Sequence, residues 1–553
     1  MSERRVRVIP LGGISEIGKN MSCVEYGQEL VIVDAGVKFP DQSLRGIDLL
    51  IPDVSYVEER RKGLLALLLT HGHEDHIGAI PFLLPRLVVP DGPPLPIYGS
   101  PLTIGFVRAK LREHGVEQFA DLREIQPRQR YMVGPFRAEF LRVAHSIPDA
   151  MAIALHSPVG TLLFTGDFKF DDSMPPQRQT DEAGLAELGD AGVLVLISDA
   201  TRAEYPGETP SEVVVTQALD RILAAAPGRV VISTFASNIA RLGDVLGAAA
   251  RRGRKAALVG RSLEQNAAVA LDLGFLPANS PIESLGVVLA LPPRQQLLLT
   301  TGAQGEPTAA LTRIATGAHP RIQIEPQDTV VISATPIPGN EETVSQTIDW
   351  LFQRGARVIY PALDPSVHVS GHASRPQLRR MIDLVRPRFV VPIHGEYRHL
   401  VLFRDLCAEA GIDASRVFLT QLGQPVEFGT ETARLGRPVA SGTLFVDRLE
   451  YHGRDHVVLR REGDLVEEGI VLVAVVVDRS RGRLVGEPVL TAQHFVEDGV
   501  LELAKAALRR ELARREEIPA YGELVGRTKV AVGRAIYQAC QRRPLVMPII
   551  AEI

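Results

Sequence analysis

Five side chains able to bind metal ions lie within six residues, at His71, His73, Glu74, Asp75 and His76. They follow the apolar run 64–69, which predicts a strand that ends in a tight loop. Neutral imidazole and carboxylate are the ligands that zinc takes in catalytic sites. His71 and His73 can bind one ion, while Asp75 and His76 can face a second ion about 3.5–4 Å away. The spacing therefore predicts two neighbouring metal sites.

Further histidines and aspartates stand where other apolar runs end. We assign His71, His73 and His145 to one ion, Asp75, His76 and His394 to the other, Asp167 as a bridge, and Asp34 as a support behind the ligands. The prediction is two divalent cations per subunit. Zn²⁺ suits imidazole and carboxylate without thiolate, but so does Mn²⁺, and the sequence leaves the metal open. A water between two such ions has a lowered pKa and attacks a phosphate or carbonyl, which predicts a hydrolase.

The length of 553 residues indicates several domains. From 206 to 360 the pattern changes to helices alternating with parallel-type strands, which predicts a doubly wound α/β module. Because strands that end in histidine resume afterwards, this module is interpreted as an insertion. The predicted order is a metal-binding domain at 1–205 and 361–450, the insertion at 206–360, a linker at 451–465 and a small α+β C-terminal domain at 466–553.

Composition excludes several classes of protein. The chain is 45% hydrophobic and has no apolar run near the roughly 20 residues of a membrane span, so we expect no membrane insertion. The start, Met1 to Val6, leads into a strand pattern and lacks a signal-peptide core, which favours a cytoplasmic location. Three distant cysteines cannot form a disulfide framework. A net charge of −5 does not by itself predict a nucleic-acid binder.

The order Asp34, 71–76, His145, Asp167 resembles the metallo-β-lactamase superfamily, which implies an αββα sandwich with a dinuclear site at the sheet edges. The inserted module, together with Asp199 and His372, resembles the β-CASP subgroup, whose members act on nucleic acids. Within that subgroup the chain resembles the bacterial ribonuclease J family. The segments that carry this resemblance are Pro10 to Gly13, Glu16 to Asn20, Thr301 to Pro307, Pro336 to Glu341 and the stretch 368–398.

This resemblance implies a 5′-to-3′ exoribonuclease that prefers 5′-monophosphorylated single-stranded RNA. It also implies endonuclease activity and a role in rRNA maturation and mRNA decay. Family members form homodimers or homotetramers through the C-terminal domain, and an RNA-degradation complex is a further partner that the sequence does not decide.

Two sets of residues have predicted roles beyond metal binding. His372, oriented by Asp199, is expected to protonate the leaving 3′-oxygen, and Asp75 is counted with the catalytic residues. By resemblance, Ser233, Ser366, His368 and Ser370 form a pocket for the 5′-monophosphate. For Ser233 and Ser366 an ordinary turn or cap hydroxyl is an equally good interpretation.

Three alternatives stay open at this stage. The chain could be a β-CASP nuclease that acts on DNA or cleaves only internally, a catalytically silent RNA scaffold, or a small-molecule lactonase or thioesterase. The scaffold is disfavoured because no ligand position is missing. The inserted module argues against a small-molecule enzyme.

Overall fold

The protein is described here by a computed structural model that covers residues 5–40, 44, 47–306, 309–337, 339–451, 454–461, 468–478, 483–493, 498–513 and 521–552. Pro307 and Pro338 of the family motifs, and part of the predicted linker 451–465, lie outside the described residues. The chain forms two compact units, Met1–Val37 with Pro52–Gly442, and Lys38–Ile51 with Thr443–Ile553. None of the described helices is long and apolar enough to cross a bilayer.

Two sheets form the sandwich of the first unit. The eight-stranded sheet has the order β20-β19-β1-β2-β3-β5-β6-β7. Its strands are β1 (Val6–Gly12), β2 (Met21–Tyr26), β3 (Glu29–Val33), β5 (Leu64–Leu68), β6 (Leu95–Gly99), β7 (Ala120–Glu124), β19 (Val426–Phe428) and β20 (Ala433–Leu435). The six-stranded sheet has the order β18-β12-β11-β10-β9-β8. Its strands are β8 (Arg130–Val133), β9 (Phe136–Arg142), β10 (Met151–His156), β11 (Thr161–Phe164), β12 (Val193–Asp199) and β18 (Phe389–Ile393).

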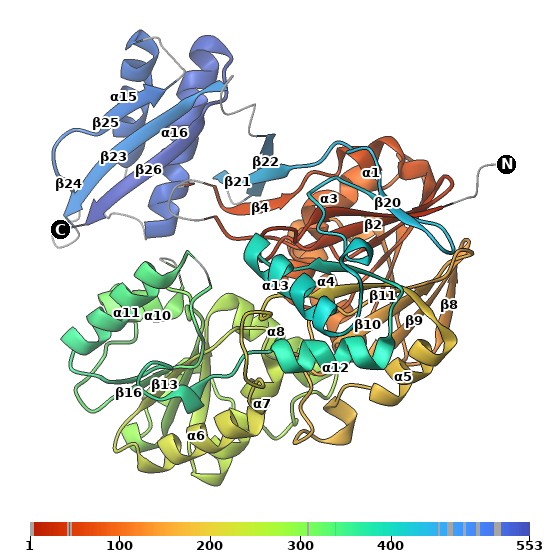
Figure 1. Ribbon diagram of the computed structural model, residues 1–553. Helices are drawn as coiled ribbons and strands as arrows, with labels where there is room; N and C mark the ends of the chain where they lie inside the picture. The colour runs from red at the N-terminus through yellow and green to blue at the C-terminus, as the bar shows by residue number, and fades with distance from the viewer. Residues whose placement is uncertain are drawn as a thin grey trace. The chain divides into compact units, whose positions relative to one another are not determined.

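Buried side chains of both sheets, such as Val24, Phe140 and Phe428, form one apolar cluster between them. Burial of this kind is the main favourable contribution to folding. The helices α1 (Ser55–Glu59), α3 (Ile80–Leu87) and α4 (Pro101–His114) accompany the first sheet, and α5 (Glu182–Ala191), α12 (Arg375–Val385) and α13 (Tyr397–Glu409) accompany the second (Figure 1). This αββα arrangement is the predicted one.

A separate parallel sheet lies between β12 and β18 in the sequence, in the order β14-β15-β13-β16-β17. Its strands are β13 (Val230–Ser233), β14 (Lys255–Val259), β15 (Gln296–Thr300), β16 (Thr329–Ile332) and β17 (Arg357–Ile359). Its helices are α6 (Glu212–Ala225), α7 (Ile239–Arg251), α8 (Arg261–Asp272), α9 (Leu285–Leu289), α10 (Ala310–Thr316) and α11 (Glu341–Gln353). The pair α10 and α11 lies on one side of the sheet, with α6 and α7 on the other (Figure 1). Helices therefore cover both faces of this parallel sheet, the arrangement that runs of apolar strand residues favour. The predicted doubly wound insertion is confirmed.

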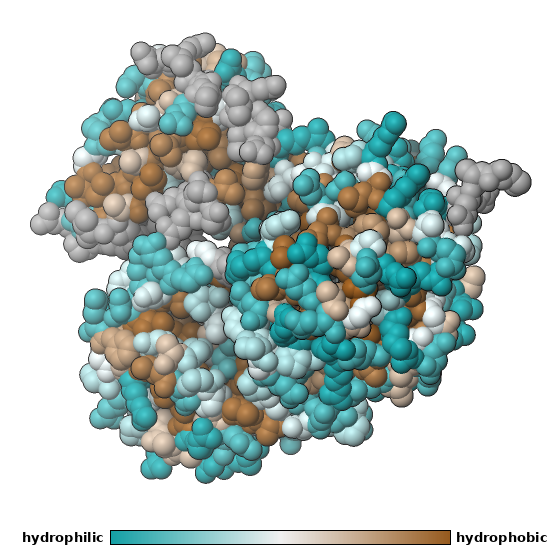
Figure 2. Space-filling view, in the orientation of Figure 1, coloured by the Kyte–Doolittle hydropathy of each residue, from teal (hydrophilic) through white to brown (hydrophobic). Residues whose placement is uncertain are grey.

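The second unit is α+β, as predicted. Its strands are β4 (Leu49–Pro52), β21 (Thr443–Tyr451), β22 (Arg454–Arg461), β23 (Ile470–Asp478), β24 (Arg483–Leu484), β25 (Val489–Gln493) and β26 (Leu545–Glu552), with helices α15 (Asp498–Leu512) and α16 (Tyr521–Cys540). Apolar residues gather over its strands (Figure 2). In this unit Val489 is 60% and Ile549 41% exposed. The prediction did not anticipate that 38–51 would belong to this unit. The predicted domain boundaries themselves stay a prediction.

Candidate metal centre

The loop after β5 holds the first four site residues in a small space. β5 ends at Leu68, and α2 (Glu74–Ile77) begins directly after His73. A Cβ at Gly72 would lie 2.8 Å from the ring of Phe106, so α4 packs too closely for a larger residue there. His71 and His76 are buried, and His73 and Asp75 are partly buried.

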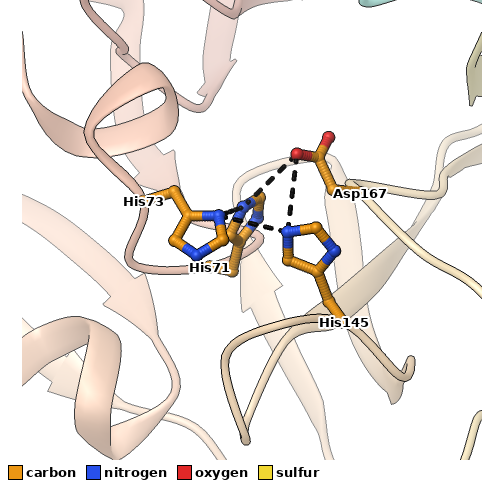
Figure 3. A group of neighbouring side chains, drawn as sticks. All are labelled: His71, His73, His145 and Asp167. Atoms are coloured by element: carbon orange, nitrogen blue, oxygen red, sulfur yellow. Dashed lines mark hydrogen bonds and ion pairs between the residues drawn. The ribbon is translucent and has the colours of Figure 1, made fainter. Parts of the chain in front are cut away.

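His71, His73, His145 and Asp167 form the first group (Figure 3). Nδ1 of His73 lies 3.1 Å from Nε2 of His71 and 3.1 Å from Nε2 of His145. Oδ2 of Asp167 is 3.6 and 3.8 Å from the same two Nε2 atoms. Two imidazole nitrogens bound tetrahedrally to one zinc ion at 2.0–2.1 Å stand roughly 3.3 Å apart. The group thus has the spacing of ligands that share one ion.

Burial keeps the imidazoles of this first group neutral. It lowers the pKa of His71 and His145 well below the usual value and lowers the pKa of His73 to about 4, and neighbouring imidazoles add to each shift. Neutral imidazole has a free lone pair and is the form that binds a cation. These three side chains are therefore ready to bind a metal ion at neutral pH.

Asp75, His76, Asp167 and His394 form the second group. Nδ1 of His394 lies 2.9 Å from Oδ1 of Asp167, and Nε2 of His76 lies 3.2 Å from Oδ2. Nε2 of His394 is 3.2 Å from Oδ2 of Asp75, but it is buried without a well-aligned hydrogen bond. Such an unsatisfied ring nitrogen among carboxylates fits a metal ligand.

In the second group the histidine pKa values are raised, whereas those of the first group are lowered. Burial lowers the pKa of His76 and His394, but the nearby carboxylates outweigh it, so the pKa of His394 rises to about 10 and that of His76 rises well above its usual value. Burial raises the pKa of Asp75 and Asp167, but the two histidines outweigh it and both values fall. The carboxylates are thus ionised, and without metal two imidazolium groups balance them. Divalent cations would take the place of these protons.

Asp34, predicted as a support behind the ligands, contacts His76 and Thr70. Its Oδ2 is 2.8 Å from Nδ1 of His76 and accepts a hydrogen bond of 2.8 Å from the Thr70 hydroxyl, while Oδ1 accepts one from the Thr70 amide. Contacts of this kind fix the orientation of a metal-binding imidazole. Asp34 and His394 both have positive φ, 60° and 52°, a conformation that non-glycine residues rarely adopt. Backbone strain at two site residues is typical of functional sites.

His372 and Asp199 form a pair beside the second group. Nδ1 of His372 lies 2.8 Å from Oδ2 of Asp199 and 3.9 Å from Oδ2 of Asp167. Oδ1 of Asp199 accepts hydrogen bonds from the amide and hydroxyl of Thr201. Burial lowers the pKa of His372, but Asp199 and Asp167 outweigh it, and the net shift is upward. The pair has the geometry that an imidazole acid needs.

Of the four residues predicted for the phosphate pocket, the three serines already make hydrogen bonds within the protein through their hydroxyl groups. The Ser233 hydroxyl is buried and donates to the Thr300 carbonyl at 3.3 Å. The Ser366 hydroxyl donates to Asp364, and the Ser370 hydroxyl accepts from the amide of His372 at 3.2 Å. His368, Ser366 and Ser370 lie on one loop. Ser333 links this loop to Ser233, because its amide donates to Ser233 and its hydroxyl donates to the carbonyl of Val367.

A buried charge network beside this loop was not predicted. Arg241, 2% exposed, donates to both carboxylate oxygens of Glu212 and to the Ser333 carbonyl. Lys169, fully buried, lies 3.7 Å from Glu212. Arg241 also donates to Nδ1 of His368 at 3.0 Å, so the proton of the neutral ring is on Nε2. Burial and the Arg241 charge lower the pKa of His368 to about 3, which keeps the ring neutral.

Asn20 is a second residue whose place was not predicted. Its side-chain nitrogen lies 3.1 Å from Nε2 of His76 and donates to the Asp75 carbonyl at 3.1 Å, while Oδ1 is buried without a hydrogen bond. In the sequence, the motif Glu16 to Asn20 indicates only the family resemblance. In the same short segment, 13–20, the carbonyl of Gly13 accepts a hydrogen bond from the backbone amide of His394. The segment therefore contacts both His76 and His394.

Four family models match the chain in sequence order. They are the metallo-beta-lactamase superfamily at residues 16–233, the ribonuclease J beta-CASP domain at 227–351, the Zn-dependent metallo-hydrolase RNA specificity domain at 365–417 and the ribonuclease J C-terminal domain at 457–553. Ribonuclease J2 of Bacillus subtilis is 38% identical over 556 residues, which cover 99% of both chains. The chain belongs to the ribonuclease J family.

Other members of the ribonuclease J family agree with this assignment. Ribonuclease J of Thermus thermophilus is 39% identical over 99% of this chain and 95% of its own length, and that of Mycolicibacterium smegmatis is 40% identical over 99% and 97%. A solved structure of a protein of unknown function from Enterococcus faecalis covers 77% of this chain and 100% of its own, with a TM-score of 0.52 and 16% identity, and shows a similar fold only. The predicted family and fold class are thus confirmed.

Proposed function

We propose that this chain is a metal-dependent ribonuclease that degrades single-stranded RNA from a 5′-monophosphorylated end in the 5′-to-3′ direction. It would also cleave internally and act in rRNA maturation and mRNA decay. Membership of the ribonuclease J family supports hydrolysis of RNA. The convergence of two ligand groups on the single carboxylate of Asp167 is the observation that carries the metal-dependent mechanism.

Two divalent cations would be held by His71, His73 and His145 on one side and by Asp75, His76 and His394 on the other, with Asp167 between them. When bound, the cations supply a nucleophilic water of lowered pKa and offset charge on the phosphate. We propose Zn²⁺, and the donor set also suits Mn²⁺. Asp34 keeps the His76 ring in place, because its Oδ2 lies 2.8 Å from Nδ1 and leaves Nε2 for a cation.

His372 would hold the proton that the leaving 3′-oxygen takes. Thr201 occupies Oδ1 of Asp199, so Oδ2 is left to accept the Nδ1 proton of His372. This hydrogen bond turns Nε2 toward the substrate and supports the charged form of the ring. Bond cleavage then needs no proton from solvent.

The 5′-monophosphate would bind at Ser233, Ser366, His368 and Ser370. His368 contributes a neutral Nε2 donor, because Arg241 occupies Nδ1. The loop that carries three of these residues continues directly into His372. A phosphate held on that loop would set the distance from the RNA end to the cleaved bond and would favour release of single nucleotides.

The primary test uses 3′-labelled single-stranded RNA with a 5′-monophosphate or a 5′-triphosphate, in Zn²⁺, Mn²⁺ or EDTA. We expect wild type to release mononucleotides, to prefer the monophosphate and to need metal, and His76→Ala to lose activity. Intact RNA under every metal condition, with binding retained, would mean an RNA scaffold instead. Equal cleavage of DNA, or cleavage only at internal positions, would point to another kind of nuclease.

His372→Asn is expected to lower kcat for normal RNA by about 10²- to 10⁴-fold, the usual contribution of a general acid. Substrate binding should change little, since His372 acts on the leaving group. The sharper measurement replaces the leaving 3′-oxygen by sulfur, because a thiolate leaves without a proton. The variant should then recover most of the lost rate. An equal defect on both substrates would exclude the proton-donor role.

We also propose a homodimer or homotetramer formed through the second unit. Val489, on β25, and Ile549, on β26, are exposed apolar residues of that unit, and contact with another copy would bury them.

A further inference from the structure

Arg202 stands next to both parts of the proposed machinery. It lies three residues after Asp199, and its backbone forms a bridge with Ser374, two residues after His372. The amide of Tyr205 donates to its carbonyl at 3.1 Å. Arg202 therefore sits on a short turn fixed between the two segments that carry the proposed acid and the residue that orients it.

The guanidinium of Arg202 has no acceptor among the residues that the structure describes. Its Nε is buried without a hydrogen bond, and the group lies 3.7 Å over the ring of Tyr205. Asp199, on the same segment, is already occupied by Thr201 and His372. Other arginines around the site are paired: Arg398 with Glu204 and Glu396, and Arg375 with Glu409.

An unpaired, half-buried cation is costly unless an anion joins it. Burial accordingly lowers the pKa of Arg202, and Tyr205 and Asp199 oppose this only in part. The Arg202 charge also reaches His368, where it contributes to the lowered pKa of that ring. The turn that carries Arg202 thus lies beside the Asp199–His372 pair, where an RNA substrate would present its phosphates.

We propose that Arg202 binds a phosphate of the RNA substrate through the N–H groups of its unpaired guanidinium, while one face of the guanidinium stacks on the ring of Tyr205. Arginine suits this task because its planar fork donates two parallel hydrogen bonds to a phosphate. Stacking on an aromatic ring holds the fork in place before the ligand arrives. The inference rests on the proposed ribonuclease function and adds a substrate-binding residue to it.

The test measures kcat and KM on short single-stranded RNA for the full-length, metal-loaded protein. It compares wild type with Arg202→Gln and Arg202→Lys. Arg398→Gln is the matched control, because Arg398 is 53% exposed and already paired. We expect Arg202→Gln to raise KM about 10- to 100-fold, the loss of a charge-assisted hydrogen bond. The slope of log(kcat/KM) against log[salt] should fall by about 0.7, the value for one phosphate contact on a single strand. Arg202→Lys should restore the slope and part of KM.

A 5′-hydroxyl RNA identifies which phosphate is bound. A defect confined to 5′-monophosphorylated RNA assigns Arg202 to the terminal phosphate, whereas an equal defect on both assigns it to an internucleotide phosphate. Unchanged KM and salt slope, or a loss in kcat alone, would overturn the inference. If wild type does not cleave RNA, the proposed function fails. Fluorescence anisotropy of labelled RNA then still compares binding by wild type and Arg202→Gln and tests Arg202 alone.

Discussion

Asp167→Asn is expected to lower kcat/KM for RNA by at least about 10³-fold. Asp167 belongs to every group of metal-binding side chains found among the described residues. Metal ions contribute several kcal/mol of charge stabilisation to such reactions, and each 1.36 kcal/mol is a factor of ten in rate. An amide keeps the shape of the carboxylate but lacks its charge, so binding of both ions should weaken. Elemental analysis should show less metal per chain than in wild type.

Asp172→Asn makes the same change on an exposed side chain, 73% accessible and 3.5 Å from Arg380. It should keep full activity and metal content. A defect in Asp167→Asn that excess metal fully reverses would mean weakened affinity only. Wild-type metal content together with wild-type rate would remove Asp167 from the site.

Arg241→Leu is expected to destabilise the inserted domain by about 3–5 kcal/mol, because it leaves Glu212 buried with less compensation. Lys169 remains 3.7 Å from Glu212, which favours the lower end of this range. Trp350 is the single tryptophan of the chain and packs against the core of the inserted domain. Its fluorescence during a urea titration should therefore show a lower midpoint for the variant.

Arg251→Leu is the control, since Arg251 lies on the same helix α7 and pairs with Asp220 while 60% exposed. Exposed pairs contribute about 1 kcal/mol or less. Removal of both partners, in Arg241→Leu with Glu212→Leu, should recover part of the loss because no unpaired charge stays buried. If Arg241→Leu unfolded at the same urea concentration as Arg251→Leu, the network would have no special role in stability.

The fold and the metal-binding groups could be predicted because they follow from local patterns. Each ligand stands where an apolar run ends, and parallel strands bring such ends to one edge of a sheet. His145, Asp167 and His394 were placed in this way, and the structure brings them together. The inserted domain was recognisable because short apolar strand segments alternate with amphipathic helical segments there, and each type has its own hydrophobic periodicity.

The remaining contacts depend on residues far apart in the sequence, and no periodic pattern marks them. Arg241 meets Glu212, His368 and Ser333, and each partner taken alone looks like an ordinary polar residue of a helix or loop. Arg202 could not be distinguished from paired surface arginines until its surroundings were known. The segment 38–51 reads as part of the first domain, although its strand β4 pairs with β21 of the second unit.

The inserted domain also controls when the site can be completed during synthesis. The Thr201 hydroxyl donates to the carbonyl of His394, 193 residues later in the chain. At about 5–20 residues per second, ribosomes need roughly 10–40 s to make that interval. Throughout it, the nascent chain already has Asp167 and Asp199 but lacks His394, and for most of it His372 and β18 are also missing. A nuclease built in this order stays incomplete on the ribosome until residue 394 has been added.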